Sequence, residues 1–191
     1  MTTVAVLFVF TGIALTQPSI GQTVTDPISA ETLQSQTNVP VLLPPNFTSV
    51  EEDPLYSEVI YVGPDGYYVA YSFIEDCGDA GYCGYARIQG HEIGSTTSHF
   101  KPDTLQALVE ERMEVLDEAT RISSDTIQDI RLVNDTPGIV LPWFGYTHPG
   151  NTEVLIEQDG YRYIFSIRAA QNQEVIDLAN SIIENQPNLE D

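Results

Sequence analysis

Three carboxylates crowd the only cysteine pair of the chain. Glu75, Asp76 and Asp79 lie beside or between Cys77 and Cys83 in a glycine-containing stretch. Carboxylates this close together suit two chemistries, the ligation of Ca²⁺ through oxygen and acid–base catalysis in a hydrolase. Their spacing departs from an EF-hand loop, which needs acids at alternate positions and a closing bidentate Glu. Acids on a solvated turn are the commoner explanation, so we predict no metal site and no cofactor.

The two cysteines themselves favour a structural role. A nucleophilic Cys77 would need a neighbouring base and a lowered pKa, whereas Asp76 and Asp79 would raise its pKa. A zinc site would need a second ligand pair, which the sequence lacks. An even cysteine pair in an exported chain is ordinarily a disulfide. We therefore predict a disulfide between Cys77 and Cys83, with a free thiol pair as the alternative.

Other residue types that carry chemistry form no motif. His91, His99 and His148 are the only histidines, and none of them begins the H-E-x-x-H pattern of a zinc protease helix. Ser72 and Ser166 lack the G-x-S-x-G elbow that exposes a nucleophile. No glycine-rich phosphate loop is present either. We predict no catalytic residue, and surface or capping roles for the histidines.

Tyrosine is the one residue type whose abundance points to binding, with ten in 191 residues. Tyr82 and Tyr85 flank the cysteine loop, and Tyr68 points away from the face that strand alternation assigns to the core. Exposed tyrosines suit contacts with peptides or sugars, so Tyr68, Tyr82 and Tyr85 are the predicted ligand contacts. The alternative is that tyrosine is simply a good strand residue.

The charge of the chain limits its partners. It carries 28 acids against 7 bases, a formal net charge of −21. Such a field repels phosphate backbones and anionic lipid surfaces, so nucleic-acid binding is disfavoured. Solubility is the commoner reason for acidity of this kind, and cationic partners or divalent ions are the alternative.

The amino-terminal residues resemble an export signal. Positions 4–15 are almost wholly apolar, and the small residues Ser19 and Gly21 suit cleavage after Gly21. The run falls short of the ~20 residues that cross a bilayer, so we predict no permanent membrane insertion. Residues 1–21 are read as a signal peptide and 22–38 as a polar linker, in a periplasmic or secreted protein. Because no Lys or Arg precedes the run, a first strand or helix of a cytosolic fold is the alternative.

Two segments have the pattern of a β-hairpin. Residues 58–73 and 153–167 each place an Asp-Gly pair between arms rich in β-branched and aromatic residues. The alternation of side chains assigns one face of the second strand of each hairpin to the core. The predicted core residues are Tyr67, Val69, Tyr71, Phe73, Tyr161, Tyr163, Phe165 and Ile167. Because such hairpins commonly arise by convergence, we read their likeness as convergence, with an internal duplication as the alternative.

Amphipathic periodicity predicts a helix after each hairpin, over 104–122 and over 173–184, the second capped by Asn172. Further strands are predicted at 84–89, 127–133 and 138–144. The fold class is therefore α+β, an antiparallel sheet with two amphipathic helices packed on one face. Residues 39–186 form the single domain and 187–191 a tail.

Residues 130–183 carry a resemblance. They contain a strand, the Pro137-Gly138 turn, the hairpin at 159–161 and a final helix that ends in Ala-Asn-Ser-Ile-Ile. This arrangement resembles the closing part of small uncharacterised bacterial exported domains, which are loosely similar to outer-membrane lipoprotein carrier and envelope-stress regulator modules. The resemblance implies a non-enzymatic envelope role in binding a ligand or a protein.

Together these observations predict an exported, non-enzymatic domain that binds a protein, a peptide or a small apolar ligand. The sheet face or the loop around Cys77 and Cys83 would make the contact. The alternative is a small exported hydrolase that uses Glu75, Asp76 or Asp79 as acid and base.

Overall fold

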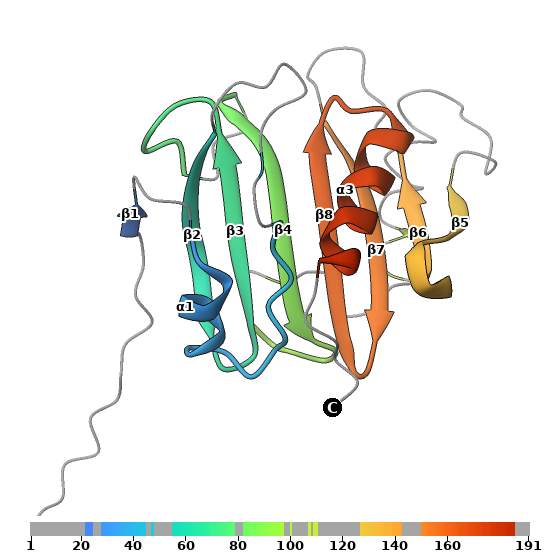
Figure 1. The fold of residues 1–191 in the computed structure, drawn as a ribbon, viewed down its shortest axis with the longest axis horizontal. Coiled ribbons are helices and arrows are strands. Elements are labelled where there is room, and N and C mark those ends of the chain that lie inside the picture. The colour runs from blue at the N-terminus through green and yellow to red at the C-terminus, as the bar shows by residue number, and fades with distance from the viewer. Residues whose placement is uncertain are drawn as a thin grey trace, which may run out of the picture.

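The strands form one antiparallel sheet, in the order β1-β2-β3-β4-β8-β7-β6-β5 (Figure 1). This computed structural model describes residues 22–24, 28–44, 47, 55–78, 82–97, 100, 107, 109–110, 127–142 and 150–185. Within them the strands are β1 Gln22–Val24, β2 Tyr56–Gly63, β3 Gly66–Ser72, β4 Gly84–Glu92, β5 Gln128–Arg131, β6 Pro137–Leu141, β7 Asn151–Gln158 and β8 Tyr161–Arg168. The helices are α1 Ala30–Gln34, the 3₁₀ turn η2 Val133–Asp135 and α3 Asn172–Glu184.

Both predicted hairpins are confirmed. β7 pairs with β8 as far as Gln158 and Tyr161, which leaves Asp159 and Gly160 as a two-residue turn. Their φ angles are 54° and 85°, and a type I′ turn requires positive φ at both positions. β2 and β3 are also joined by two residues, but these are Pro64 and Asp65, because Gly66 already pairs with Gly63. Proline cannot adopt a positive φ and Asp65 does not have one, so this turn is not of type I′. The strands predicted at 84–89, 127–133 and 138–144 correspond to β4, β5 and β6.

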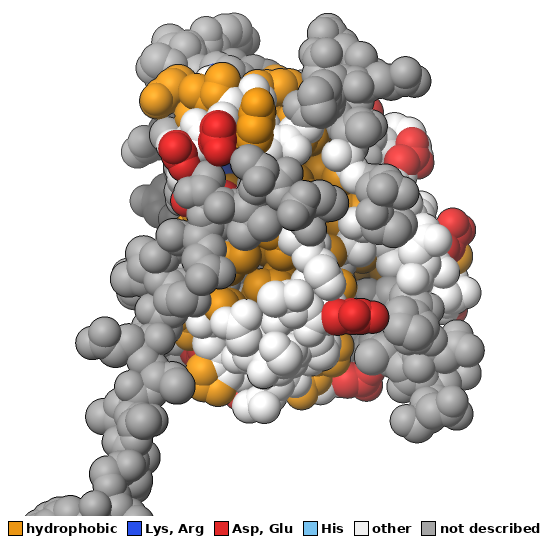
Figure 2. All heavy atoms as spheres, turned by 60° about the vertical axis from the view of Figure 1, so that its left-hand side comes forward, with side chains coloured by type: hydrophobic (Ala, Val, Ile, Leu, Met, Phe, Trp, Pro, Cys, Tyr) orange, Lys and Arg blue, Asp and Glu red, His pale blue; other side chains and the backbone are white. Residues whose placement is uncertain are grey.

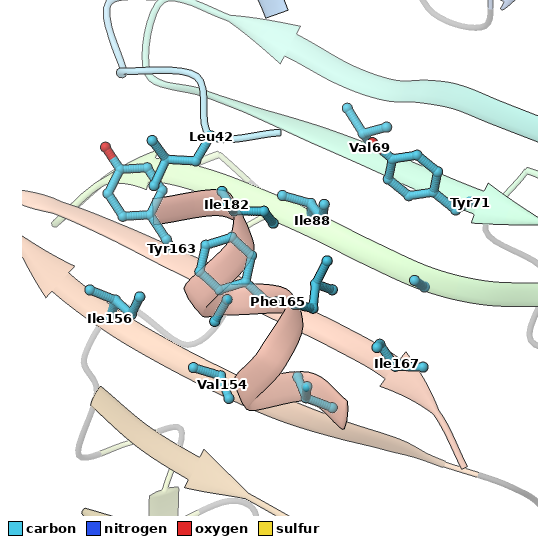
Figure 3. Close-up of a cluster of buried hydrophobic side chains, with 14 of the residues drawn as sticks. Leu42, Val69, Tyr71, Ile88, Val154, Ile156, Tyr163, Phe165, Ile167 and Ile182 are labelled. Carbon is cyan, nitrogen blue, oxygen red and sulfur yellow. The ribbon is translucent and has the colours of Figure 1, made fainter. Parts of the chain in front are cut away.

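The main core lies between the sheet and α3 (Figure 3). α3 buries Val175, Leu178, Ala179 and Ile182 against the sheet face that carries Phe165. The periodicity predicted this helix to within one residue, although its N-cap is Gln171 rather than Asn172. The predicted core face is confirmed except at Phe73, which is 46% exposed.

A smaller apolar cluster lies on the opposite sheet face. It consists of Leu141, Leu155 and Ile164, and Val109 packs against it. Leu155 is on that face because its neighbours Val154 and Ile156 point into the main core. Most of the helix predicted over 104–122 lies outside the described residues. The prediction of two helices on one face is therefore not confirmed: α3 covers one face, and Val109 packs on the other.

The segment predicted as a linker contributes to the fold. β1 pairs with β2, and α1 places Leu33, which is 2% exposed, in the main core. The Gln34 side chain ties this helix to the next stretch, because its amide oxygen accepts a hydrogen bond from the Val41 N–H at 2.8 Å. A five-residue helix with a single buried residue is too short to produce a helical periodicity, which is why the pattern indicated a linker.

The two halves of the sheet meet where β4 pairs with β8. The strand order places β2-β3-β4 on one side of this seam and β6-β7-β8 on the other. A two-fold axis between β4 and β8 would relate β2 to β6 and β3 to β7. The hairpins of similar sequence are instead β2-β3 and β7-β8. The topology therefore gives the alternative of an internal duplication no support. The predicted signal peptide, residues 1–21, and the tail, residues 187–191, lie outside the described residues.

Candidate functional site

A disulfide closes the loop between β3 and β4. Cys77 and Cys83 are bonded with their Cα atoms 6.0 Å apart, as the sequence predicts. Both cysteines are buried, at 8% and 5% exposure. The loop lies at the end of the sheet opposite to the two hairpin turns (Figure 1).

Hydrogen bonds from three strands hold this loop in place. The Glu58 carboxylate of β2 accepts one from the Gly78 N–H at 2.9 Å. Arg168, at the end of β8, donates one to the Tyr82 carbonyl at 2.7 Å. The Phe73 N–H, directly after β3, donates one to the Cys83 carbonyl at 3.1 Å. The loop is therefore fixed to the sheet as well as closed on itself.

Replacing both cysteines by serine is expected to lower the free energy of unfolding by about 2 kcal/mol, because the short ring no longer restricts the unfolded chain. Urea unfolding at neutral pH, with Cys77→Ser/Cys83→Ser against the oxidised parent, measures the difference. The parent in a reductant serves as the matched control and should behave like the variant. Equal stability of the variant and the oxidised parent would contradict the prediction.

Large apolar side chains are exposed around this loop. Tyr56 is 42%, Phe73 46%, Ile74 49% and Tyr82 78% exposed, and these four residues are called the loop patch. They lie at one sheet end because Tyr56 pairs with Ser72, the residue before Phe73, and Tyr82 directly precedes Cys83. Figure 2 shows hydrophobic side chains gathered at the upper end of the molecule, with acidic side chains just below them. Grouped exposure of this kind marks interaction sites more often than single exposed residues do.

An aromatic series connects the loop patch to the core. The Phe73 ring meets Tyr85 with centroids 5.1 Å apart, and Tyr85 meets Phe47 at 5.8 Å. Phe47 in turn meets Tyr71 edge-on at 4.9 Å, and Tyr71 belongs to the main core. Contacts of this geometry stabilise each ring beyond its burial. Phe73 is therefore exposed but held in a fixed position.

The three tyrosines predicted to touch a ligand differ in exposure. Tyr82 lies in the loop patch, whereas Tyr68 and Tyr85 are only 4% and 9% exposed. Buried side chains meet a ligand only after rearrangement, so the structure supports Tyr82 alone as a contact. Sequence patterns missed the other three residues of the loop patch, Tyr56, Phe73 and Ile74, and strand alternation had assigned Phe73 to the core.

The two described carboxylates of the loop face the solvent. Glu75 and Asp76 are exposed, and Asp79 lies outside the described residues. An acid–base pair needs a cleft that shields one carboxyl group, so this exposure gives the hydrolase alternative no support. Within the described part of the chain, no three His, Cys, Asp or Glu side chains are placed to hold a metal ion.

A second group of polar residues lies on the sheet face opposite α3. Arg162 is 1% exposed, and its Nε and Nη2 atoms lie 2.9 and 2.5 Å from Oε1 of Glu157. His91, paired with Arg162 across β4 and β8, is 4% exposed and stacks on Phe100 with centroids 4.6 Å apart. Phe100 fits there because Gly66 has no side chain: a Cβ would lie 2.7 Å from the ring.

His91 is buried in its neutral form. Burial first and the Arg162 charge second lower its pKa to about 4, against a smaller opposite effect from Asp65. Its Nδ1 atom is buried without a hydrogen-bond partner among the described residues. These features make it a packed structural histidine. The other two histidines, His99 and His148, lie outside the described residues.

Asp65 closes the hairpin turn next to this group. Its carboxylate accepts hydrogen bonds from Tyr61 and Ser95, both at 2.5 Å, and from Thr97. Burial acts to raise the pKa of Asp65, but the hydroxyl donors outweigh it and lower the pKa below its ordinary value. The cluster fastens the β2–β3 turn to the chain after β4, which is a structural role.

An open groove of about 410 Å³ lies at the β5–β6–β7 side of the sheet. Ile139 and Leu155 supply apolar lining, while Asp129, Arg131 and Glu157 supply charge. Small apolar ligands bind in concave sites with this mixture of apolar and polar lining. The groove is distant in sequence from the loop patch and shares no residue with it.

Comparison with known proteins identifies no relative. No family model, no curated protein and no solved structure matches this chain. Among the described residues there is no helix with the length and apolar character needed to span a bilayer. Any functional conclusion therefore rests on the geometry of the chain itself.

Proposed function

We propose that this chain is an exported, non-enzymatic domain that binds a polypeptide segment through the loop patch. The observation that carries the proposal is the exposure of Tyr56, Phe73, Ile74 and Tyr82 around a loop fixed by a disulfide. Large amphipathic rings provide contact area at a low cost in conformational entropy. The disulfide and the aromatic series beneath Phe73 reduce that cost further, because the surface is already ordered before binding.

The compartment in this proposal rests on two features. The first is the apolar run at positions 4–15, which has the length of a secretory signal. The second is the disulfide, which persists in oxidising compartments. The resemblance to lipoprotein carrier and envelope-stress modules points to the same non-enzymatic envelope role and stays a prediction.

Peptide selection on the immobilised full chain tests the binding role. We expect enriched peptides to bind the parent with micromolar affinity. They should bind the Phe73→Ser/Tyr82→Ser variant at least about tenfold more weakly, because exposed aromatic anchors contribute most of such binding energy. Ile93→Ser is the matched control, since Ile93 is also exposed, at 42%, but follows β4 at the other end of the sheet.

Three results would count against the proposal: no enrichment of any peptide, equal loss in the control, or no loss in the double variant. Circular dichroism melting of each variant checks that the fold is intact.

A small apolar ligand is the second candidate, because the groove at β5–β7 is concave and partly apolar. Binding that survives the loop-patch substitutions would favour the groove.

A further inference from the structure

The loop that carries Phe73, Ile74 and Tyr82 of the patch has a net negative charge. Residues 73–83 include Glu75, Asp76 and Asp79 and contain no Lys, Arg or His. Glu75 and Asp76 directly follow Ile74 of the loop patch, and both are exposed. A partner that covers Phe73 and Ile74 therefore meets two carboxylates at the edge of the same contact.

The backbone beside these carboxylates is fixed before binding. Asp76 has φ 56°, a left-handed conformation that Asp tolerates better than most residues. The following Cys77 is fixed by the disulfide, and the Gly78 N–H is bound to Glu58. Charges on an ordered loop offer a partner a constant geometry, so little ordering is needed when a cation approaches.

The charge of the whole chain acts in the same direction. A net charge of −21 attracts cationic segments over distances beyond direct contact and speeds their association. The same field repels a second copy of this chain, an anionic lipid surface or a nucleic acid. An apolar patch is otherwise open to self-association, so the charge restricts the class of partner.

From these observations we infer that the loop patch selects a basic polypeptide segment, in which an apolar or aromatic anchor is flanked by Lys or Arg. The anchor contacts Phe73, Ile74 and Tyr82, and the flanking cations approach Glu75 and Asp76. This inference rests on the proposed function and adds the chemistry of the partner. The charges then discriminate between basic and other peptides, while the apolar contact contributes the affinity that all peptides with the same anchor share.

The experiment uses the full chain and three synthetic peptides that share one Trp-Leu anchor and differ in their flanks, which are Lys, Ser or Glu. Titration calorimetry or tryptophan fluorescence gives each dissociation constant. At about 0.02 M salt, where screening is weak, we expect the Lys peptide to bind about tenfold more tightly than the Ser peptide. At about 1 M salt the two affinities should converge to within about twofold.

Paired variants separate the local charges from the overall field. Glu75→Gln/Asp76→Asn removes the two carboxylates beside the loop patch. Glu31→Gln/Glu184→Gln removes two exposed carboxylates from α1 and α3 and produces the same net charge. We expect the first pair to weaken Lys-peptide binding about fivefold and to leave the Ser peptide within about twofold, whereas the second pair changes neither by more than about twofold.

The outcomes distinguish the two claims. If all three peptides bind equally and Phe73→Ser/Tyr82→Ser abolishes the binding, the proposed function stands and the selection of basic segments is overturned. If both charge pairs weaken the Lys peptide equally, the general field rather than the loop selects it, and the inference fails. If no peptide binds at any salt concentration, the proposed function fails as well. Circular dichroism melting of the exposed-site variants confirms that each is folded.

Discussion

Glu157→Gln is expected to lower the free energy of unfolding by about 2–3 kcal/mol, because it removes a carboxylate charge that contacts a buried guanidinium. Arg162 is 1% exposed, so water has no access that would compensate the lost carboxylate. Arg162→Met is expected to cost less. The Glu157 side chain is 33% exposed and can turn to solvent when the arginine is gone.

Urea unfolding at neutral pH measures both changes. The matched control is Arg131→Met, which breaks an ion pair with Asp135 in which the side chains are 67% and 86% exposed. Pairs at the surface contribute less than about 1 kcal/mol, so this variant should be close to the parent. A larger loss for Arg162→Met than for Glu157→Gln would show that the other contacts of the arginine outweigh its attraction to Glu157.

The hairpins, α3 and the disulfide could be predicted because each has a local cause. An Asp-Gly turn between alternating arms defines the β7–β8 hairpin, and an apolar stripe of helical period defines α3. In α3 the cap was misplaced by one residue, since Glu174 accepts a hydrogen bond from the Gln171 N–H at 2.5 Å. Local patterns identify an element more reliably than its ends.

Phe73 shows why the candidate binding surface was only partly predictable. Its place in the alternation of β3 assigns it to the core, but pairing with β2 stops at Ser72. The next N–H, that of Phe73, instead bonds the Cys83 carbonyl across the loop. A strand ends where the adjacent strands no longer supply backbone hydrogen-bond partners. No pattern within residues 58–73 indicates where that happens.

The grouping of polar residues on the sheet face opposite α3 could not be predicted without knowing the register of the strands. His91, Arg162 and Glu157 come from β4, β8 and β7, and they meet because His91 pairs with Arg162 and Arg162 with Glu157. In the sequence, His91 and Arg162 are far apart and each has the appearance of a solvent-facing strand residue. Long-range pairing is specified by the whole hydrophobic pattern of the sheet rather than by the residues that it brings together.

His91 gives the second large expected effect, a loss of stability in mild acid. Its pKa is about 4 in the folded protein and about 6.5 in the unfolded chain. As the pH falls through this window, His91 is protonated in the unfolded chain before it is protonated in the folded protein. The contribution of His91 to the free energy of unfolding is therefore complete above about pH 6.5 and declines toward about pH 4. The decline amounts to about 3 kcal/mol, at the conversion of about 1.36 kcal/mol per pKa unit, for a pKa that falls from 6.5 to about 4.

Two measurements check this effect. An NMR titration of the histidine ring signals should show one signal, absent in His91→Gln, that titrates near pH 4. Urea unfolding between about pH 7 and 4 should give a steeper loss for the parent than for His91→Gln. Using the difference between the two proteins cancels the contribution of the carboxylates, which titrate in both. An ordinary pKa for that signal, with parallel stability curves, would contradict the prediction.

The two predictions are coupled through Arg162. Its positive charge is the second cause that lowers the pKa of His91, after burial. Arg162→Met should therefore move the His91 titration upward and reduce the acid-sensitive part of the stability, while Glu157→Gln, which retains the arginine, should not. If His91 titrated at the same pH in Arg162→Met as in the parent, burial beside Phe100 alone would account for its low pKa, and His91 would be independent of the Arg162–Glu157 ion pair.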